Sequence, residues 1–194
     1  MAELLRTDRL LVRDWSLDDA DAALAIYGND VARWLLPEQD RILDTAAMRE
    51  VLQIWIAEQA DMAPGTGRWV LVLRNGGTLV GGIALLPMPV PEADVEVDYR
   101  LVPEHWGQGY ITEAVRALAH WAFQHSLVEV FALVCPTNTR AAATARRIGM
   151  EWVGESDKYH RRHLEVFRLR PDDLVSACRS ALPRSSPRVT GRPG

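Results

Sequence analysis

A short stretch in the middle of the chain combines carboxylates, glycines and the start of a helix. Glu96 and Asp98 come first, and Gly107 and Gly109 then stand directly before a segment with helical periodicity. Glycine lets the backbone turn tightly and approach a ligand closely, and the free N–H groups of a helix start bind phosphate. A carboxylate can act as a general base. These residue types suit a phosphate-bearing ligand held beside an acid–base reaction.

Two common phosphate-binding fingerprints do not fit this stretch. The G-x-G-x-x-G pattern of dinucleotide-binding proteins would need a glycine where Thr112 stands. No Gly-Lys-Ser/Thr follows either, which excludes a Walker loop. A plain tight turn at the two glycines remains open as the alternative.

The elements around the glycines are a strand before them and a helix after them. In residues 93–102 apolar and charged side chains alternate, which predicts a strand with Glu96 and Asp98 on one face. Residues 110–125 repeat apolar side chains at helical spacing, which predicts a helix with one buried stripe.

The rest of the chain supplies further strands and helices. Ser16 is a plausible N-cap for the helix at 17–27, and the turn Asn75-Gly76-Gly77 joins two strands into a hairpin. The remaining expected elements are strands at 9–14, 68–73, 78–86, 128–134, 151–155 and 163–169, and helices at 45–60 and 138–148. This order predicts an α/β fold with a mixed sheet.

Composition narrows the class of protein. The 194 residues carry a net charge of −4, which disfavours a nucleic-acid surface because such surfaces need clustered Lys and Arg. We expect no membrane partner, since no apolar run could span a bilayer. With no signal-peptide pattern at the start and two widely separated cysteines, Cys135 and Cys178, we expect a cytoplasmic protein with reduced thiols.

Three stretches resemble the RimJ/RimL-like branch of the GCN5-related N-acetyltransferase (GNAT) superfamily. Residues 103–114 (PEHWGQGYITEA) resemble its P-x-x-W-G-x-G-Y-A-T-E-A signature. Residues 7–22 are similar to its T-e-R-L-x-L-R…D-a start, and residues 138–150 to its N-x-x-S…G-F motif. The resemblance covers about residues 4 to 171.

The resemblance implies a fold and a domain plan. The expected fold is the GNAT fold, α/β (α+β), with a mixed, mostly antiparallel twisted sheet of six to seven strands flanked by about four helices. The expected domain is 1–171, followed at 172–194 by a short C-terminal helix and a disordered tail rich in Pro, Arg, Ser and Gly.

The resemblance also implies acetyl-CoA as co-substrate and no metal. Backbone groups of Leu101 and Val102 would pair with the pantetheine arm, and Asn138 would bind it near the thioester. A helix N-cap is an alternative or additional role for Asn138. The pyrophosphate would lie in a loop formed by Trp106, Gly107, Gln108, Gly109, Tyr110, Ile111 and Thr112.

The implied activity is N-acetyl transfer by direct attack in a ternary complex. The acceptor would be a primary amine, on a protein N-terminus or on a small molecule such as an aminoglycoside. Glu96 would be the general base, directly or through water, and Asp98 the second candidate; Glu96 could instead be a solvent-side strand residue. Backbone N–H near Val102 would hold the oxyanion. A homodimer stays open.

Departures from the family pattern concern the group that protonates the leaving thiolate. Ala141 and Ala145 replace the Ser and Tyr that relatives use. Tyr110 and Tyr159 are candidate stand-ins, although a packed or surface tyrosine is the favoured interpretation of each. Ile111 replaces a smaller residue and could loosen pyrophosphate binding. The missing acids favour the competing hypothesis, a catalytically silent acyl-CoA-binding or sensing module, whereas the retained Glu96 and Asn138 oppose it.

Other residues that could do chemistry receive simpler interpretations. His160 and His163 lack further ligands at metal spacing, which favours a solvated loop. Cys135 follows a buried strand and is expected to act as a small apolar residue. Trp34 and Trp55 lie in the helical region that shapes the acceptor pocket in the family and could line its wall.

Overall fold

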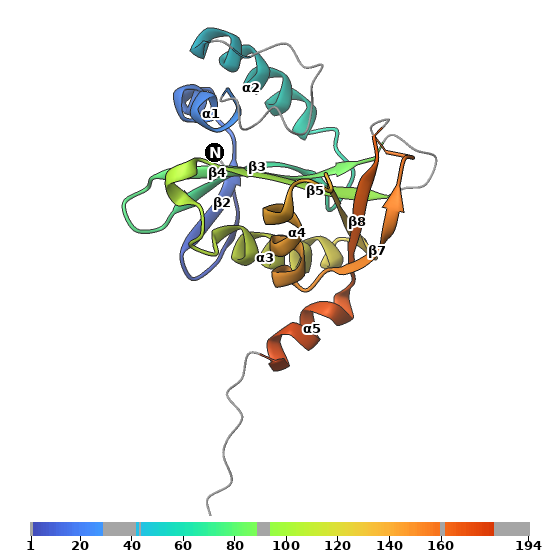
Figure 1. The fold of residues 1–194 in the computed structure, drawn as a ribbon. Helices are drawn as coiled ribbons and strands as arrows, with labels where there is room; N and C mark the ends of the chain where they lie inside the picture. Colours follow the sequence, from blue (N-terminus) through green and yellow to red (C-terminus); the bar gives the residue numbers. More distant parts are fainter. Residues whose placement is uncertain (1, 29–41, 43, 89–93, 160–161, 181–194) are drawn as a thin grey trace, which may run out of the picture.

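The protein is built around one eight-stranded sheet with helices on both faces (Figure 1). A computed structural model describes residues 2–28, 42, 44–88, 94–159 and 162–180. The strands are β1 (Glu3–Arg6), β2 (Leu10–Asp14), β3 (Gly67–Leu73), β4 (Leu79–Pro87), β5 (Val95–Leu101), β6 (Val130–Val134), β7 (Glu151–Ser156) and β8 (Leu164–Leu169). The helices are α1 (Ala20–Tyr27), α2 (Thr45–Gln59), α3 (Tyr110–Gln124), α4 (Thr139–Ile148) and α5 (Pro171–Ser180).

The strand order is β1-β2-β3-β4-β5-β6-β8-β7. Neighbours pair antiparallel everywhere except between β5 and β6, which are parallel. The parallel pair follows from the connection, because α3 lies between the two strands in the chain and a crossover helix returns the chain in the same direction. The α/β fold with a mixed, mostly antiparallel sheet is therefore confirmed.

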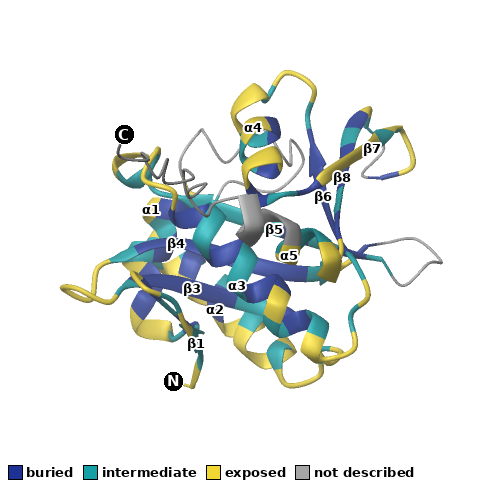
Figure 2. Ribbon diagram, turned by 90° about the horizontal axis from the view of Figure 1, so that it is seen from below, coloured by how far each residue is buried: buried dark blue, intermediate teal, exposed yellow. Residues whose placement is uncertain are grey.

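Helices α1 and α2 cover one face of the sheet, and α3 and α4 cover the other (Figure 1). Successive side chains of β3 point to opposite faces of the sheet. Leu71 packs in the cluster under α3 and α4, while Val70 and Val72 pack in the cluster under α1 and α2. The central strands β3 and β4 are accordingly mostly buried (Figure 2).

Helix α3 is the element that presents the glycines. It begins after Gly109, whose φ of +80° is a left-handed conformation that glycine adopts without strain. The predicted apolar stripe is buried, with Val115 and Leu118 each 1% exposed against the sheet. Arg116 donates to the carbonyl oxygens of Ile148 at 2.9 Å and Arg147 at 2.8 Å, which fastens α3 to the end of α4.

The strand count of six to seven was wrong, whereas about four helices do flank the sheet and a short C-terminal helix follows, as predicted. The sequence-based prediction missed β1, whose residues Glu3–Arg6 are too few to show a clear alternation and are held by pairing with β2. Over the described residues the chain forms five α-helices, since α5 at Pro171–Ser180 adds to the four that flank the sheet.

The helix expected at 17–27 has a break near its start. Residues Leu17–Asp19 form a 3₁₀ turn before α1 begins at Ala20. Ser16 caps this turn as predicted, because its side chain accepts from the Asp18 N–H at 3.1 Å while Asp19 accepts from the Ser16 N–H at 2.9 Å.

Some predictions fall on residues that the structure leaves undescribed. They concern Trp34, His160, the side chain of Cys178, most of the proline-rich loop at 87–92, and the tail beyond Ser180. Within the described ranges, no helix is long and apolar enough to cross a membrane.

Candidate active site

The site begins where two neighbouring strands part. Strand β5 pairs with β6 at Glu96 and Phe131, the one pairing that these strands make in the described chain. Beyond Glu96, β5 continues along β4 as far as the pairing of Leu101 with Gly81. The far half of β5 is thus paired on its β4 side alone, and a cleft opens on its other side.

The hydrogen-bonding direction of the backbone alternates along β5, and this alternation determines which groups face that cleft. The Val102 N–H donates to the Val80 carbonyl at 3.1 Å, so its hydrogen-bonding groups point toward β4. Because this direction alternates along an antiparallel strand, the N–H and C=O groups of Tyr99 and Leu101 point toward the cleft. One of these groups already has a partner, because Trp106 Nε1 donates to the Leu101 carbonyl oxygen at 2.9 Å.

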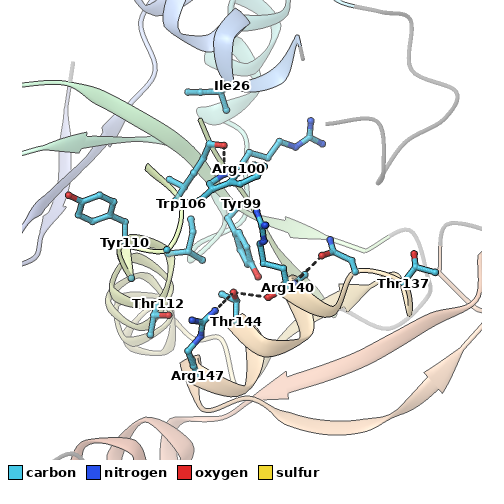
Figure 3. Close-up of a pocket in the computed structure, with 16 residues that line it drawn as sticks. Ile26, Tyr99, Arg100, Trp106, Tyr110, Thr112, Thr137, Arg140, Thr144 and Arg147 are labelled. Carbon is cyan, nitrogen blue, oxygen red and sulfur yellow. Dashed lines mark hydrogen bonds between the residues drawn. The ribbon is translucent and has the colours of Figure 1, made fainter. Parts of the chain in front are cut away.

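The cleft has a volume of about 890 Å³ and opens between β5, the start of α3 and the start of α4 (Figure 3). It is lined by Ile26, Tyr99, Arg100, Leu101, Trp106, Gly107, Gly109, Tyr110, Ile111, Thr112, Thr137, Asn138, Arg140, Ala141, Thr144 and Arg147. Arginines are the charged members of this lining, and no described carboxylate belongs to it. The cleft is therefore suited to an anionic ligand.

The glycine loop forms the anion-binding end of the cleft. Gly107 and Gly109 have φ angles of +76° and +80°, and both line the cleft. The Glu113 N–H is the one that bonds back to the Gly109 carbonyl, at 3.1 Å. The N–H groups of residues 110–112 precede it and have no partner in the helix ladder, so they are available to oxygen atoms of a phosphate.

Asn138 lies at the start of α4, in the wall of the cleft opposite the glycine loop. Its Oδ1 accepts from the Ala141 N–H at 3.1 Å at the start of α4, which confirms the N-cap geometry. The side chain also lines the cleft, and its Nδ2 makes no hydrogen bond within the described part of the chain. One residue can therefore cap α4 and donate to a ligand.

Arginines from α4 supply positive charge along the same wall. Arg140 lies over the Trp106 ring, 4.5 Å from its centroid, which joins α4 to the glycine loop across the cleft. Arg147 donates to Thr144 Oγ1 at 3.0 Å. The sequence-based prediction named Asn138 but not these two arginines, although their spacing of seven residues places them on one helix face.

Tyr99 is the residue that the sequence-based prediction missed most clearly. It extends from β5 into the space between α3 and α4 (Figure 3). Burial, followed by the charge of Asp98, raises the pKa of its phenol to about 12. The hydroxyl makes no hydrogen bond to any residue in the described ranges, so a protonated donor stands in the cleft. The alternation that put Tyr99 opposite the acids could have identified it.

Glu96 and Asp98 lie on the opposite face of β5. The side chains of even-numbered residues point toward α1, where Arg100 lies over the Tyr27 ring, 5.0 Å from its centroid. Burial, with the nearby Asp98 charge, raises the pKa of Tyr27. Neither acid lines the cleft itself, but Glu96 stands at its apex, where β5 and β6 part.

The structure brings most of the expected cofactor residues together. Those lining the cleft are Leu101, Trp106, Gly107, Gly109, Tyr110, Ile111, Thr112 and Asn138. Val102 and Gln108 do not line it, and the Val102 N–H expected to hold an oxyanion is already bonded to Val80. The N–H groups of Tyr99 and Leu101 point toward the cleft instead.

The proposed stand-in acids differ in position. Tyr110 lines the cleft at the glycine end, but it is 9% exposed, with Arg9 over its ring at 4.7 Å. Tyr159 is 7% exposed in a separate apolar cluster with Met88 and Phe131. Ile111 is packed into the core and also lines the cleft.

The described residues hold no group of three or more His, Cys, Asp and Glu side chains that could bind a metal ion. His163 is exposed and contacts Asp157 Oδ1 and Glu155 Oε2, each at 3.0 Å. These hydrogen bonds, first that with Asp157, raise the pKa of His163. The pair of contacts forms a surface ion cluster.

Comparisons with known proteins identify a family and similar folds. Residues 9–151 match the family described as Acetyltransferase (GNAT) domain. The uncharacterized N-acetyltransferase YoaA of Bacillus subtilis is 25% identical over 162 residues, covering 82% of this chain and 89% of YoaA. A crystal structure of an acetyltransferase from Agrobacterium tumefaciens is 26% identical with a TM-score of 0.69, covering 86% of this chain and 93% of that one. The ribosomal-protein-S5-alanine acetyltransferase from Vibrio fischeri, at 20% identity and a TM-score of 0.69, covers 88% of this chain and 97% of that chain and shares the fold.

A matched pair of glycine substitutions tests the loop. Gly107 and Gly77 have φ angles of +76° and +69°, and a Cβ at either would meet nothing within 4 Å. Gly107→Ala and Gly77→Ala should therefore cost similar backbone strain, about 1–2 kcal/mol each. We expect only Gly107→Ala to weaken acetyl-CoA binding, by about tenfold or more, because its methyl group would project at the phosphate end of the cleft. Calorimetric titration and urea unfolding separate the two effects; equal affinities would contradict the loop assignment.

Proposed function

The chain belongs to the GNAT acetyltransferase family, and we propose that it transfers an acetyl group from acetyl-CoA to a primary amine by direct attack in a ternary complex. The observation that carries this proposal is the cleft at the divergence of β5 and β6. It offers unpaired strand edge, a helix start and arginines in one continuous space. A ligand with an amide-containing arm and a pyrophosphate matches each of these in turn.

The residues of the cleft fit coenzyme A along its length. Arg140, Arg147 and the N–H groups at 110–112 would hold its phosphates. The C=O of Tyr99 and the N–H of Leu101 would pair with the amide groups of the pantetheine arm, as a further strand would. Asn138 Nδ2 would donate to the same arm from the opposite wall. Bound in this way, the co-substrate supplies the activated acetyl group.

The backbone N–H of Tyr99 has the geometry to stabilise negative charge. As the acceptor nitrogen attacks, charge develops on the acetyl oxygen, and preorganised N–H donors lower the energy of that state. The Tyr99 N–H points into the cleft on the Glu96 side of Leu101, whereas the Val102 N–H is already bonded to Val80. We assign the oxyanion role to the Tyr99 N–H in place of Val102, because the Leu101 N–H lies nearer the glycine loop and would pair with the pantetheine arm.

Glu96 is our proposed general base, with Asp98 as its alternate. A protonated amine cannot attack, so a group near the acceptor must take its proton. Glu96 lies at the apex of the cleft on the face that carries α1, and Asp98 follows on the same face. Since neither lines the cleft, the proton would reach the carboxylate through a water molecule.

Tyr99 is our proposed general acid. The departing sulfur needs a proton or a hydrogen-bond donor, and the α4 positions Ala141 and Ala145 offer only methyl groups. With a pKa near 12, the Tyr99 phenol keeps its proton at neutral pH. It therefore fills the gap that favoured a silent acyl-CoA-binding module.

We further propose a cytoplasmic enzyme of the RimJ/RimL-like branch. The ribosomal-protein acetyltransferase among the structural neighbours supports that branch. The acceptor would be a protein N-terminus or a small amine such as an aminoglycoside, reaching the cleft from the side of Ile26.

Release of free thiol tests the proposal directly. Purified protein is incubated with acetyl-CoA and a panel of N-terminal peptides, polyamines and aminoglycosides, and thiol is measured against a no-acceptor control. We expect at least one amine to be turned over. Tight acetyl-CoA binding with no turnover across the panel would instead support the silent binding module.

Glu96→Gln tests the base. The variant preserves size and hydrogen bonding but cannot accept the amine proton, so we expect kcat to fall about 10²-fold at neutral pH. The loss should shrink as pH rises, because more of the amine is already neutral. Acetyl-CoA affinity should stay unchanged. A kcat near the wild-type value at every pH would move the base role to Asp98 or to solvent.

Tyr99→Phe tests the acid, with Tyr110→Phe as its matched control. Both variants remove one hydroxyl from a tyrosine that lines the cleft. We expect Tyr99→Phe to lower kcat about 10²-fold with acetyl-CoA affinity retained, and Tyr110→Phe to leave kcat within about twofold. If the two variants behave alike, Tyr99 is a packing residue and the acid lies elsewhere.

A further inference from the structure

One arginine outside the cleft contacts the glycine loop from behind. Arg9 lies in the turn between β1 and β2, and its Nη1 donates to the Gln108 carbonyl oxygen at 2.9 Å. Its Nε donates to Glu113 Oε2 at 2.6 Å, and its guanidinium lies 4.7 Å from the centroid of the Tyr110 ring. A single side chain thus joins the loop to the first turn of α3.

The bond to Gln108 fixes the orientation of one peptide group. In a trans peptide the C=O of Gln108 and the N–H of Gly109 point in opposite directions, and no described peptide bond is cis. Arg9 holds the carbonyl outward, so the Gly109 N–H points away from Arg9 and toward the cleft that Gly109 lines. Glycine at 109 would also tolerate the flipped peptide. In that orientation the Gln108 oxygen would face the phosphate site and repel an anion.

Arg9 also neutralises a carboxylate close to the anion site. Glu113 lies in the first turn of α3 and accepts from Thr7 Oγ1 at 2.5 Å and from the Arg9 N–H at 2.9 Å. Burial works against its ionisation, but these hydrogen bonds and the Arg9 charge leave its pKa below the ordinary value. An ionised Glu113 without Arg9 would weaken the attraction of the helix start for phosphate.

We infer that Arg9 is a positioning residue for co-substrate binding: it orients the Gln108–Gly109 peptide and cancels the Glu113 charge, so that the loop presents N–H donors to the pyrophosphate. This inference rests on the proposed binding of acetyl-CoA in the cleft. Arg9 itself does not line the cleft. Its effect should therefore appear in the affinity for ligands that carry the pyrophosphate and not in the chemical step.

The experiment compares Arg9→Met with a surface arginine of similar environment. The Arg9 side chain is 47% exposed beside Glu113, and Arg170 is 51% exposed beside Glu129, to which its Nε donates at 3.1 Å. Each Met variant retains an unbranched side chain and loses one ion pair. Thermal unfolding reports stability, and calorimetry reports affinity for CoA, for 3′-dephospho-CoA and for pantetheine, which lacks the pyrophosphate.

We expect Arg9→Met to weaken binding of CoA and of 3′-dephospho-CoA by the same factor, about tenfold, and to leave pantetheine binding unchanged. The KM for acetyl-CoA should rise while kcat at saturation stays within about twofold. Arg170→Met should change none of these, and Arg9→Lys should restore part of the affinity because it keeps the charge and one donor.

Three outcomes would overturn the inference. Arg9→Met could bind CoA as the wild type does, could weaken pantetheine equally, or could lower kcat without raising KM. If Arg9→Met does not fold, Arg9→Lys carries the test, and CoA affinity equal to the wild type's then overturns it. Failure of the wild type to bind CoA is a separate result that removes the proposed function itself.

Discussion

The site depends on one constraint, the obligation of backbone N–H and C=O groups to find hydrogen-bond partners. Strand β5 satisfies this obligation toward β4 along its length, but toward β6, within the described chain, only around the pairing of Glu96 with Phe131. The groups that remain, those of Tyr99 and the N–H of Leu101, form an open strand edge inside the molecule. An open edge binds another extended chain, and here the glycine loop and α4 restrict which chain can reach it.

The rest of the fold maintains this opening. Helix α3 links β5 to β6, and Arg116 fastens it to the end of α4, so the two walls of the cleft are tied together away from the strands. Because successive side chains of β5 point to opposite faces of the sheet, each face carries a different set of residues. Odd-numbered residues such as Tyr99 serve the co-substrate side, and even-numbered residues such as Glu96 serve the side of α1. The proposed acid and base thereby approach a reacting centre from different directions.

Much of this could be predicted from local sequence patterns. The apolar stripe after Gly109 gave α3, and the alternation in 93–102 gave β5 with its acids on one face. What the sequence could not show depends on pairing between distant segments. Short β1 is defined by β2, the commitment of the Val102 N–H by Val80, and the place of Arg9 by a loop about a hundred residues further along the chain. The alternation in 93–102 could have identified Tyr99, but its position between α3 and α4 depends on how these distant segments pack.

The central claim is that the edge of β5 beyond Glu96 binds the pantetheine arm. Residue-resolved amide hydrogen exchange, with and without acetyl-CoA, tests it most directly. The Val102 amide, already bonded to Val80, should exchange slowly in both states. The Leu101 amide should exchange rapidly in the free protein and become protected with the ligand, together with the amides of 110–112. Protection confined to other segments, or a Leu101 amide that stays unprotected in the complex, would contradict the account.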